Sequence, residues 1–307
     1  MNSSITVAIC TYNRSFILER TLKSLTRQTV SPSQFELIVV DNGSQDDTIK
    51  ICNMMKDELP DLRYISTQTN TGTSMARNAA FKASKGDYIL FMDDDSIASE
   101  TWIERLSSAL DREAIVSGGI VSPVSNYLKL CHNIAQFYAY MPGQKEGPVE
   151  FFCGCNMGFR RSVLEELKGF QAGSICEDTE IIIRARIKGY RAHFVPDAFV
   201  IHDPPGRTTL TEILKYSSLH ASSTILLRNQ YSRLLNTPFI LRSPFLILLF
   251  APLIALKVTA GIYLNNSYLR KFFYTAPMVY ILKLAWCWGA SQGLRNFRKN
   301  EKRQENS

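Results

Sequence analysis

Three consecutive acidic residues, Asp93, Asp94 and Asp95, stand directly after the short apolar run Tyr88–Met92. Because carboxylates this close repel one another, such a cluster is stable when a cation lies among its oxygens. Carboxylate oxygens favour Mg²⁺ or Mn²⁺, and these ions commonly share their coordination shell with substrate phosphates. The cluster therefore predicts a site for a divalent metal and a phosphate-bearing ligand. A structural interpretation stays open, since an acidic turn also caps a following helix.

A Walker B segment, in which an apolar strand also ends in acids, is the main alternative for this pattern. It requires a loop of the form GxxxxGK[ST] earlier in the chain, and no glycine here is followed by Lys-Ser or Lys-Thr. The dinucleotide-binding pattern GxGxxG is absent as well. We therefore expect a phosphate ligand to be bound through the metal rather than by a glycine-rich loop.

The elements that would position these acids alternate between strand and helix over the first 120 residues. The expected strands are Ile5–Cys10, Phe35–Val40, Leu62–Ile65, Tyr88–Met92 and Ala114–Ile120. The expected helices are Phe16–Gln28, Asp46–Asp57, Ser74–Ser84 and Glu100–Leu110. This alternation predicts an α/β fold, with a largely parallel sheet and helices on both faces. Ligands of such sheets bind at the carboxyl ends of the strands, where the acids stand.

The pattern is looser beyond residue 120. We expect a helix at Leu128–Tyr140, a loop at Met141–Pro148, a strand at Glu150–Phe152, a helix at Asp178–Lys188, a strand at Tyr190–Val195 and a helix at Thr209–Leu235.

The order of motifs resembles that of the inverting glycosyltransferases of family 2, which have the GT-A fold. The matching segments are Val7–Arg14, Val39–Thr48, Asn70–Asn78, Phe91–Asp95, Gly154–Arg161 and the pair Glu177-Asp178. Each segment is weakly specific alone, but the ordered set at compatible spacing is specific. The resemblance covers about residues 5–205. It implies transfer of a sugar from a nucleotide-diphosphate sugar, with a UDP-sugar favoured, to a saccharide or lipid-linked acceptor hydroxyl.

The resemblance assigns the donor-binding residues. Thr11, Tyr12 and Arg14 would line the nucleotide pocket after the first strand. Asp41 would accept hydrogen bonds from a uracil-like base, for which a carboxylate is well suited. Arg77 would reach the diphosphate or ribose, although an ordinary helix-surface arginine is the structural alternative.

The resemblance also assigns the metal ligands. Asp93 and Asp95 would be the outer acids of the family's DxD motif, with Asp95 the direct ligand, and Asp94 would take its variable middle position near the donor. His202 follows the strand-like Ala198–Ile201 and would be a third ligand, unless it is only a loop hydrogen-bond donor. The cofactor implied is Mn²⁺ or Mg²⁺.

Asp178 is the implied general base. Displacement at an anomeric carbon needs a carboxylate beside the acceptor hydroxyl and a metal beside the leaving diphosphate. Asp178 would stand at the start of a helix, where the structural alternative is a plain N-cap. Glu177 would orient the acceptor or a neighbouring donor, and Asn156 would lie near the sugar or acceptor.

Two apolar stretches of spanning length, Ser243–Leu264 and Phe272–Leu294, carry one lysine each, Lys257 and Lys283. A lysine at mid-span costs about 3 kcal/mol on insertion scales. Two tilted spans, two helices lying in the membrane interface, and buried helices of a soluble domain all remain open.

The basic excess lies in the same region. Residues 1–235 hold 25 Lys and Arg against 26 Asp and Glu, whereas residues 236–307 hold 10 against 2. A basic charge confined to an apolar region favours an anionic membrane surface over nucleic acid. The seven cysteines show no framework spacing, and the N-terminus has no signal-peptide pattern, so we expect reduced thiols and a location on the cytoplasmic face of the membrane.

These observations predict a GT-A catalytic domain at residues 1–235 and a membrane-associated helical region at residues 236–307. A sugar-nucleotide pyrophosphorylase is the alternative from a neighbouring enzyme class, but its glycine-rich N-terminal loop is missing. A catalytically silent membrane scaffold is the non-enzymatic alternative, and the intact acids Asp93, Asp95 and Asp178 argue against it.

Overall fold

The computed structural model describes residues 4–173 and 176–304, which divide into two compact units. Unit 1 comprises Met1–Ser122 and Ala139–Pro205, and unit 2 comprises Pro123–Tyr138 and Gly206–Ser307. The division differs from the boundary expected at residue 235. The reason is that helix α8, Leu210–Gln230, packs along the C-terminal helix α12, Ala276–Gln304.

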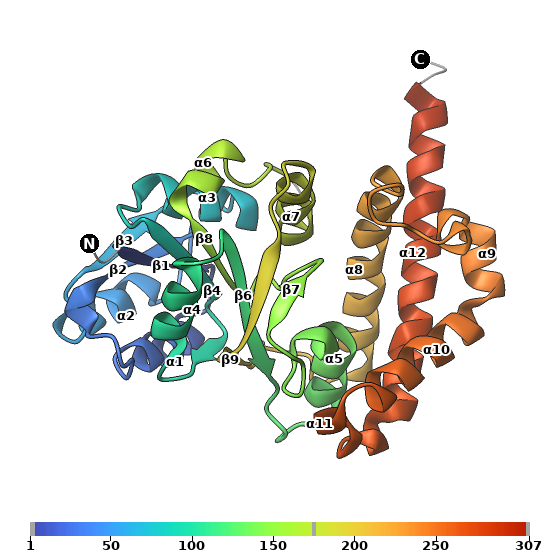
Figure 1. Cartoon of the computed structure of the whole chain (residues 1–307), viewed down its shortest axis with the longest axis horizontal. Helices are drawn as coiled ribbons and strands as arrows, with labels where there is room; N and C mark the ends of the chain where they lie inside the picture. Colours follow the sequence, from blue (N-terminus) through green and yellow to red (C-terminus); the bar gives the residue numbers. More distant parts are fainter. Residues whose placement is uncertain (1–3, 174–175, 305–307) are drawn as a thin grey trace. The chain divides into compact units, whose positions relative to one another are not determined.

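The described strands of unit 1 form one sheet in the order β3-β2-β1-β4-β8-β6-β9-β5, and β7 also pairs with β9 (Figure 1). Their bounds are β1 Ile5–Thr11, β2 Phe35–Asp41, β3 Leu62–Ser66, β4 Tyr88–Asp93, β5 Ser96–Ala98, β6 Ile115–Val121, β7 Gly147–Val149, β8 Asn156–Arg160 and β9 Ala192–His202. Strands β1 to β4 are mutually parallel, as predicted. Strand β8 runs antiparallel to both β4 and β6, so the second half of the sheet is mixed. The strand predicted at Glu150–Phe152 is wrong, because β7 ends at Val149.

Helices cover both faces of this sheet. They are α1 Ser15–Leu25, α2 Thr48–Met54, α3 Thr73–Ala83, α4 Trp102–Leu110, α6 Arg161–Glu166 and α7 Glu177–Ile187. On one face, side chains such as Ala80 of α3, Leu164 of α6 and Ile181 of α7 pack with Phe91 in a buried cluster. Because side chains alternate along a strand, the buried Ile9 points to the other face, where Figure 1 places α1, α2 and α4. The α/β fold class is confirmed.

The carboxyl ends of the central parallel strands meet at one edge. In the strand register, Thr11 of β1 pairs with Asp41 of β2, and Cys10 of β1 pairs with Asp93 of β4. The predicted donor-pocket and metal residues are therefore brought together by the sheet itself.

Unit 2 is helical. Its helices are α5 Tyr127–Phe137, α8, α9 Pro244–Leu249, α10 Ala251–Leu264, α11 Ser267–Arg270 and α12. Two glycines let α12 approach α8 closely: a Cβ at Gly289 would lie 2.0 Å from the Ser218 carbonyl oxygen, and one at Gly293 would lie 2.5 Å from that of Ser222. Backbones this close leave no room for larger side chains, so these glycines set the spacing of the pair.

Two tilted spans are one of the three possibilities left open for the apolar stretches, and the helices of the described residues do not support that possibility. Within residues 4–173 and 176–304, no helix combines the length and the apolar character needed to cross a membrane. The first stretch is divided between α9 and α10, with Phe250 between the two helices and Pro244 and Pro252 in their first turns. In the second apolar stretch, the Lys283 Nζ donates a hydrogen bond of 2.6 Å to the Ala135 carbonyl oxygen of α5.

Candidate active site

The three carboxylates of the acidic turn differ in their exposure to solvent. Asp93 ends β4 with 39% of its side chain exposed, whereas Asp94 and Asp95 are 4% and 7% exposed. The alternative interpretation of the acids as a helix cap is wrong, since β5 follows them instead of a helix. Of the three, Asp93 is the carboxylate most open to a ligand.

Asp94 is held by the end of β1 and the loop that follows it. Thr11 Oγ1 donates a hydrogen bond of 2.7 Å to its Oδ2, and Arg14 Nη1 donates one of 2.8 Å to its Oδ1. Burial raises the pKa of Asp94 to about 6, although Arg14 opposes this effect. The side chains of Thr11, Arg14 and Asp94, predicted to contact the donor, are thus bonded to one another and fix the turn. Tyr12 is 43% exposed and the Arg14 side chain is 41% exposed, whereas Thr11 is buried.

Arg77 of α3 joins the acidic turn to the start of α7. Its Nη2 donates hydrogen bonds to Asp93 Oδ1 at 3.0 Å and to the Gly154 carbonyl oxygen at 2.8 Å, and its Nη1 donates to Glu177 Oε1 at 2.6 Å. The side chain is 4% exposed, so the interpretation as a surface arginine is wrong. Burial alone would lower the pKa of Arg77, but the carboxylates of Glu177 and Asp93 hold it above its ordinary value. Its charge is therefore permanent, and it positions both acids.

Asp178 lies in the first turn of α7, close to Gly154. Its Oδ2 accepts a hydrogen bond of 3.0 Å from the Gly154 N–H, and its Oδ1 accepts one of 2.6 Å from the Thr179 N–H. The N-cap of α7 is Cys176 rather than Asp178. The plain N-cap interpretation of Asp178 is therefore wrong, and its half-buried carboxylate is oriented instead toward the Gly154 segment.

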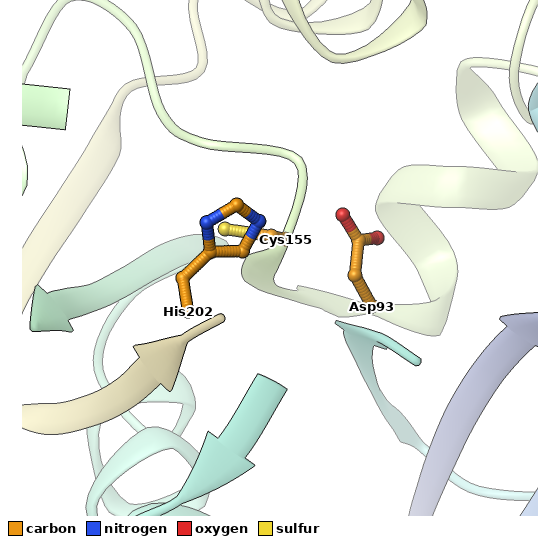
Figure 2. Close-up of side chains that lie close together, drawn as sticks. All are labelled: Asp93, Cys155 and His202. Carbon is orange, nitrogen blue, oxygen red and sulfur yellow. The ribbon is translucent and has the colours of Figure 1, made fainter. Parts of the chain in front are cut away.

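Three different ligand atoms converge beside the acidic turn. One carboxylate oxygen of Asp93, the sulfur of Cys155 and a ring nitrogen of His202 lie within 4.8 Å of one another (Figure 2). The His202 Nε2 also lies 3.4 Å from Asp95 Oδ1. Oxygen, nitrogen and sulfur donors at these separations suit a divalent ion. The structure thus brings the predicted ligands Asp93, Asp95 and His202 together and adds Cys155.

Asp41 lies at the end of β2 and is 2% exposed. Its Oδ1 accepts a hydrogen bond of 2.8 Å from the Ser44 N–H, and its Oδ2 accepts one of 2.5 Å from the Tyr64 hydroxyl. Burial and this bond to Asp41 raise the pKa of Tyr64 to about 12. A carboxylate oxygen has two lone pairs, so Asp41 keeps capacity for a further donor such as a nucleobase N–H.

Asn156 has a structural role that differs from the predicted sugar or acceptor contact. Its Oδ1 accepts a hydrogen bond of 2.8 Å from Trp102 Nε1, and its Nδ2 donates bonds of 2.9 Å to the carbonyl oxygens of Gly119 and Ala198. The side chain is fully buried. All its strong hydrogen-bonding atoms are engaged within the protein, so it joins β8 to its neighbours.

Some residues at this edge were not singled out from sequence. Asn42 ties together the loops after β2 and β3, donating to Asn70 Oδ1 at 3.0 Å and accepting from the Thr71 N–H at 3.0 Å. Gly154 leaves room for its neighbours, since a Cβ there would lie 3.1 Å from Asp178 Oδ2 and 3.2 Å from Arg77 Nη1. Gly154 and Cys155 both belong to the motif Gly154–Arg161. Their contacts are with residues distant in the sequence, so no local sequence pattern could predict them.

A cavity of about 350 Å³ lies at the opposite edge of the sheet, near Ile5 and Phe35 at the amino ends of β1 and β2. Its charged lining includes Glu36 and Arg63, which form an ion pair with each other. The charges of Glu36 and Arg63 compensate each other, and the predicted reactive groups lie elsewhere. We therefore place the candidate site at the edge of the sheet where the parallel strands have their carboxyl ends.

Models of protein families match two overlapping parts of the chain. The model of glycosyl transferase family 2 matches residues 6–168, and that of glycosyl transferase family group 2 matches residues 88–291.

Three curated relatives match between 38% and 66% of this chain. A probable glycosyltransferase of Bacillus subtilis, YdaM, is 27% identical over 213 residues, which are 66% of this chain and 51% of the relative. The glycosyltransferase AglE of Haloferax volcanii is 26% identical over 201 residues, 64% of this chain and 66% of the relative. The poly(ribitol-phosphate) beta-glucosyltransferase of Bacillus spizizenii is 33% identical over 117 residues, 38% of this chain and 18% of the relative. The chain thus spans about half to two thirds of the length of the first two.

Solved structures share the fold. The mannosyltransferase PcManGT from Pyrobaculum calidifontis, in complex with GDP-Man and Mn²⁺, has a TM-score of 0.65 and 18% identity, covering 96% of this chain and 87% of that one. TarS 1-349 of S. aureus, in complex with UDP-GlcNAc, has a TM-score of 0.57 and 16% identity, covering 97% of this chain and 92% of that one.

Proposed function

The chain belongs to glycosyl transferase family 2 and is a transferase with the GT-A fold, and from this premise we propose an inverting, metal-dependent transfer of a sugar from a nucleotide-diphosphate sugar to an acceptor hydroxyl. One observation supports this most. Gly154 connects the candidate base to the acidic turn: its N–H donates to Asp178, and its carbonyl oxygen accepts from Arg77, which also bonds Asp93.

In the proposed reaction, Asp178 accepts the proton of the acceptor hydroxyl through one carboxylate oxygen. Its two backbone contacts orient the carboxylate, and Glu177 is held at its side by Arg77. A divalent ion bound by Asp93, Asp95 and His202 would neutralise negative charge on the leaving diphosphate. Attack from the face opposite the diphosphate inverts the anomeric centre.

The proposed donor is a UDP-sugar, with Asp41 accepting an N–H of the base. Tyr12 is exposed and follows Thr11, which pairs with Asp41 in the strand register. The neighbours PcManGT and TarS are complexed with GDP-Man and UDP-GlcNAc, so a nucleotide sugar is common to both. A ligand at 100 times its Kd stabilises a protein by about 2.7 kcal/mol. We therefore expect UDP with Mn²⁺ to raise the melting temperature more than GDP or dTDP with Mn²⁺. Equal melting temperatures with and without all three nucleotides would contradict the proposal.

The proposed acceptor is the hydroxyl of a saccharide or a lipid-linked saccharide. Relatives named for such products include the succinoglycan biosynthesis protein ExoM of Rhizobium meliloti, 27% identical over 208 residues, 65% of this chain and 66% of the relative. The pyrophosphorylase alternative is not supported by any of the family matches given above, and a silent scaffold would not need Asp93, Cys155 and His202 held at ligand separation.

Gly154→Ala is expected to lower kcat by roughly tenfold or more, because the added Cβ pushes against both Asp178 and Arg77, and small displacements of catalytic groups cost large factors in rate. Two of the three nearest atoms are side-chain ends and none is backbone, so we expect only a small change in stability. The matched control is Gly261→Ala in α10, where a Cβ meets only Asn265 Nδ2 at 3.7 Å. Equal kcat in both variants would contradict the role of Gly154.

We propose further that unit 2 attaches the enzyme to an anionic membrane surface, on the cytoplasmic side. On α10, Ala251, Ala255 and Thr259 are buried, while Leu253 and Leu256 are 62% and 58% exposed. The segment 236–300 contains eight Lys or Arg and no Asp or Glu. An exposed apolar helix face within a purely basic segment suits the interface of an anionic bilayer.

The double variant Leu253→Ser/Leu256→Ser is expected to lower binding to phosphatidylglycerol vesicles by about tenfold or more, because each leucine buried in lipid contributes on the order of 1 kcal/mol or more. Leu219→Ser is the matched control, since Leu219 of α8 is 59% exposed but lies outside α10. Co-sedimentation with anionic and neutral vesicles measures the effect. Unchanged binding of the double variant, or loss of self-association instead of lipid binding, would contradict the proposal.

A further inference from the structure

Cys155 lies among the predicted metal ligands because of how the strands pair. Strand β4 runs antiparallel to β8 with Met92 opposite Asn156, and the Asp93 N–H donates a bond of 3.4 Å to the Cys155 carbonyl oxygen. Asp93 and Cys155 are therefore direct neighbours across the two strands.

His202 reaches the same place from β9. It pairs with Ser96 of β5, and the Asp203 N–H donates a bond of 2.9 Å to the Asp95 carbonyl oxygen. Backbone hydrogen bonds thus hold all three donor residues, and Figure 2 shows Cys155 and His202 side by side, with Asp93 beside them.

The sulfur of Cys155 is in an unusual position for a core thiol. The residue is 3% exposed, and its Sγ lies 3.1 Å from that of Cys153 and within 4.8 Å of an Asp93 carboxylate oxygen. A buried thiol that only filled space would gain nothing from a carboxylate and an imidazole at ligand separation. Thiolates bind borderline-soft ions such as Zn²⁺ and Co²⁺ well, whereas Mg²⁺ prefers an all-oxygen shell.

We propose that Cys155 is a sulfur ligand of the divalent ion, together with Asp93 and His202, and that it makes this site prefer Mn²⁺, Co²⁺ or Zn²⁺ over Mg²⁺. The inference rests on the proposed function, since it concerns the metal of the same site. On binding, the Cys155 thiol releases its proton to water and its sulfur forms a bond to the metal. Cys153 is not one of the proposed ligands; its sulfur lies 3.1 Å from the sulfur of Cys155.

Co²⁺ reports sulfur coordination directly, through a sulfur-to-cobalt charge-transfer band in the near ultraviolet. The full chain is stripped of metal, kept reduced with a phosphine and titrated with Co²⁺. We expect the band in the wild type and in Cys153→Ser, and its loss in Cys155→Ser. We also expect excess Zn²⁺ to remove the band and excess Mg²⁺ to leave it. The preference for Mn²⁺ over Mg²⁺, measured by competition for Co²⁺, is expected to fall about 10–100-fold in Cys155→Ser.

Cys153→Ser is the matched control, because it removes a buried thiol from the same turn, two residues away. A band of equal strength in Cys155→Ser, Co²⁺ bound without the band in the wild type, or no binding of Co²⁺ at all would each overturn the inference. Release of nucleoside diphosphate from a nucleotide sugar, measured on the same preparations, separates this outcome from failure of the proposed function. If release is normal and the band is absent, only the role of Cys155 is wrong.

Discussion

Asp178→Asn is expected to lower kcat by roughly 10²–10⁴-fold, the usual range for loss of a general base, while the affinity for the nucleotide donor stays nearly unchanged. The amide has almost the size of the carboxylate but cannot accept the proton of the acceptor hydroxyl. The structure also predicts a modest loss of stability. Asp178 accepts backbone N–H bonds through both oxygens, from Gly154 and Thr179, and an asparagine offers only one oxygen.

Initial rates, donor titrations and melting curves separate these effects. Asp197→Asn is the matched control, since Asp197 is an exposed carboxylate on β9 of the same unit. We expect Asp197→Asn to keep wild-type kcat. If Asp178→Asn turned over normally, or if it lost donor affinity as severely as kcat, Asp178 would act in folding or binding and not as the base.

Asp93→Ala is expected to abolish the effect of metal on nucleotide binding. In the wild type, Mn²⁺ should tighten binding of the nucleoside diphosphate, and chelation by EDTA should remove both this gain and the activity. Loss of groups that only support metal ligands already costs 10–100-fold in metal affinity, so loss of a ligand should cost about 100-fold or more.

Asp93→Ala is a cleaner test than Asp95→Ala for a structural reason. Arg77 keeps Glu177 and the Gly154 carbonyl oxygen as partners when Asp93 is removed, so its buried charge stays compensated. Asp95, by contrast, is 7% exposed and contacts Arg14 and His202. Calorimetric titration of the nucleotide with and without Mn²⁺ measures the effect. An equal gain from Mn²⁺ in Asp93→Ala and the wild type would show that Asp93 does not bind the metal.

The first half of the fold could be predicted from sequence because its signals are local. Strands β1, β2 and β4 are continuous apolar runs that end in polar turns, and a parallel sheet buries such runs on both faces. The position of the acids at one edge follows from this alternation alone. Strand β8 could not be predicted in the same way, because its five residues include Gly158 and an asparagine and follow a glycine turn.

Residue roles were harder to predict than elements, because side-chain partners come from distant segments. Arg14 bonds acids 80 and 81 residues away, and the three partners of Asn156 lie on three different segments. Cys155 becomes a candidate ligand only once β8 is known to run antiparallel to β4. In unit 2, hydropathy left spanning, interfacial and buried helices all open, because apolar length alone does not show that helices break at Phe250 or pack on one another.

The most direct test of the central claim is turnover by the purified chain. A panel of nucleotide-diphosphate sugars is incubated with the wild type and with Asp178→Asn, in Mn²⁺ and in EDTA, together with simple saccharide acceptors, and release of nucleoside diphosphate is followed. We predict release from at least one donor by the wild type in Mn²⁺, with release lost both in EDTA and in Asp178→Asn. Release that is unaffected by EDTA and by Asp178→Asn, or no release and no binding with any donor, would contradict the account.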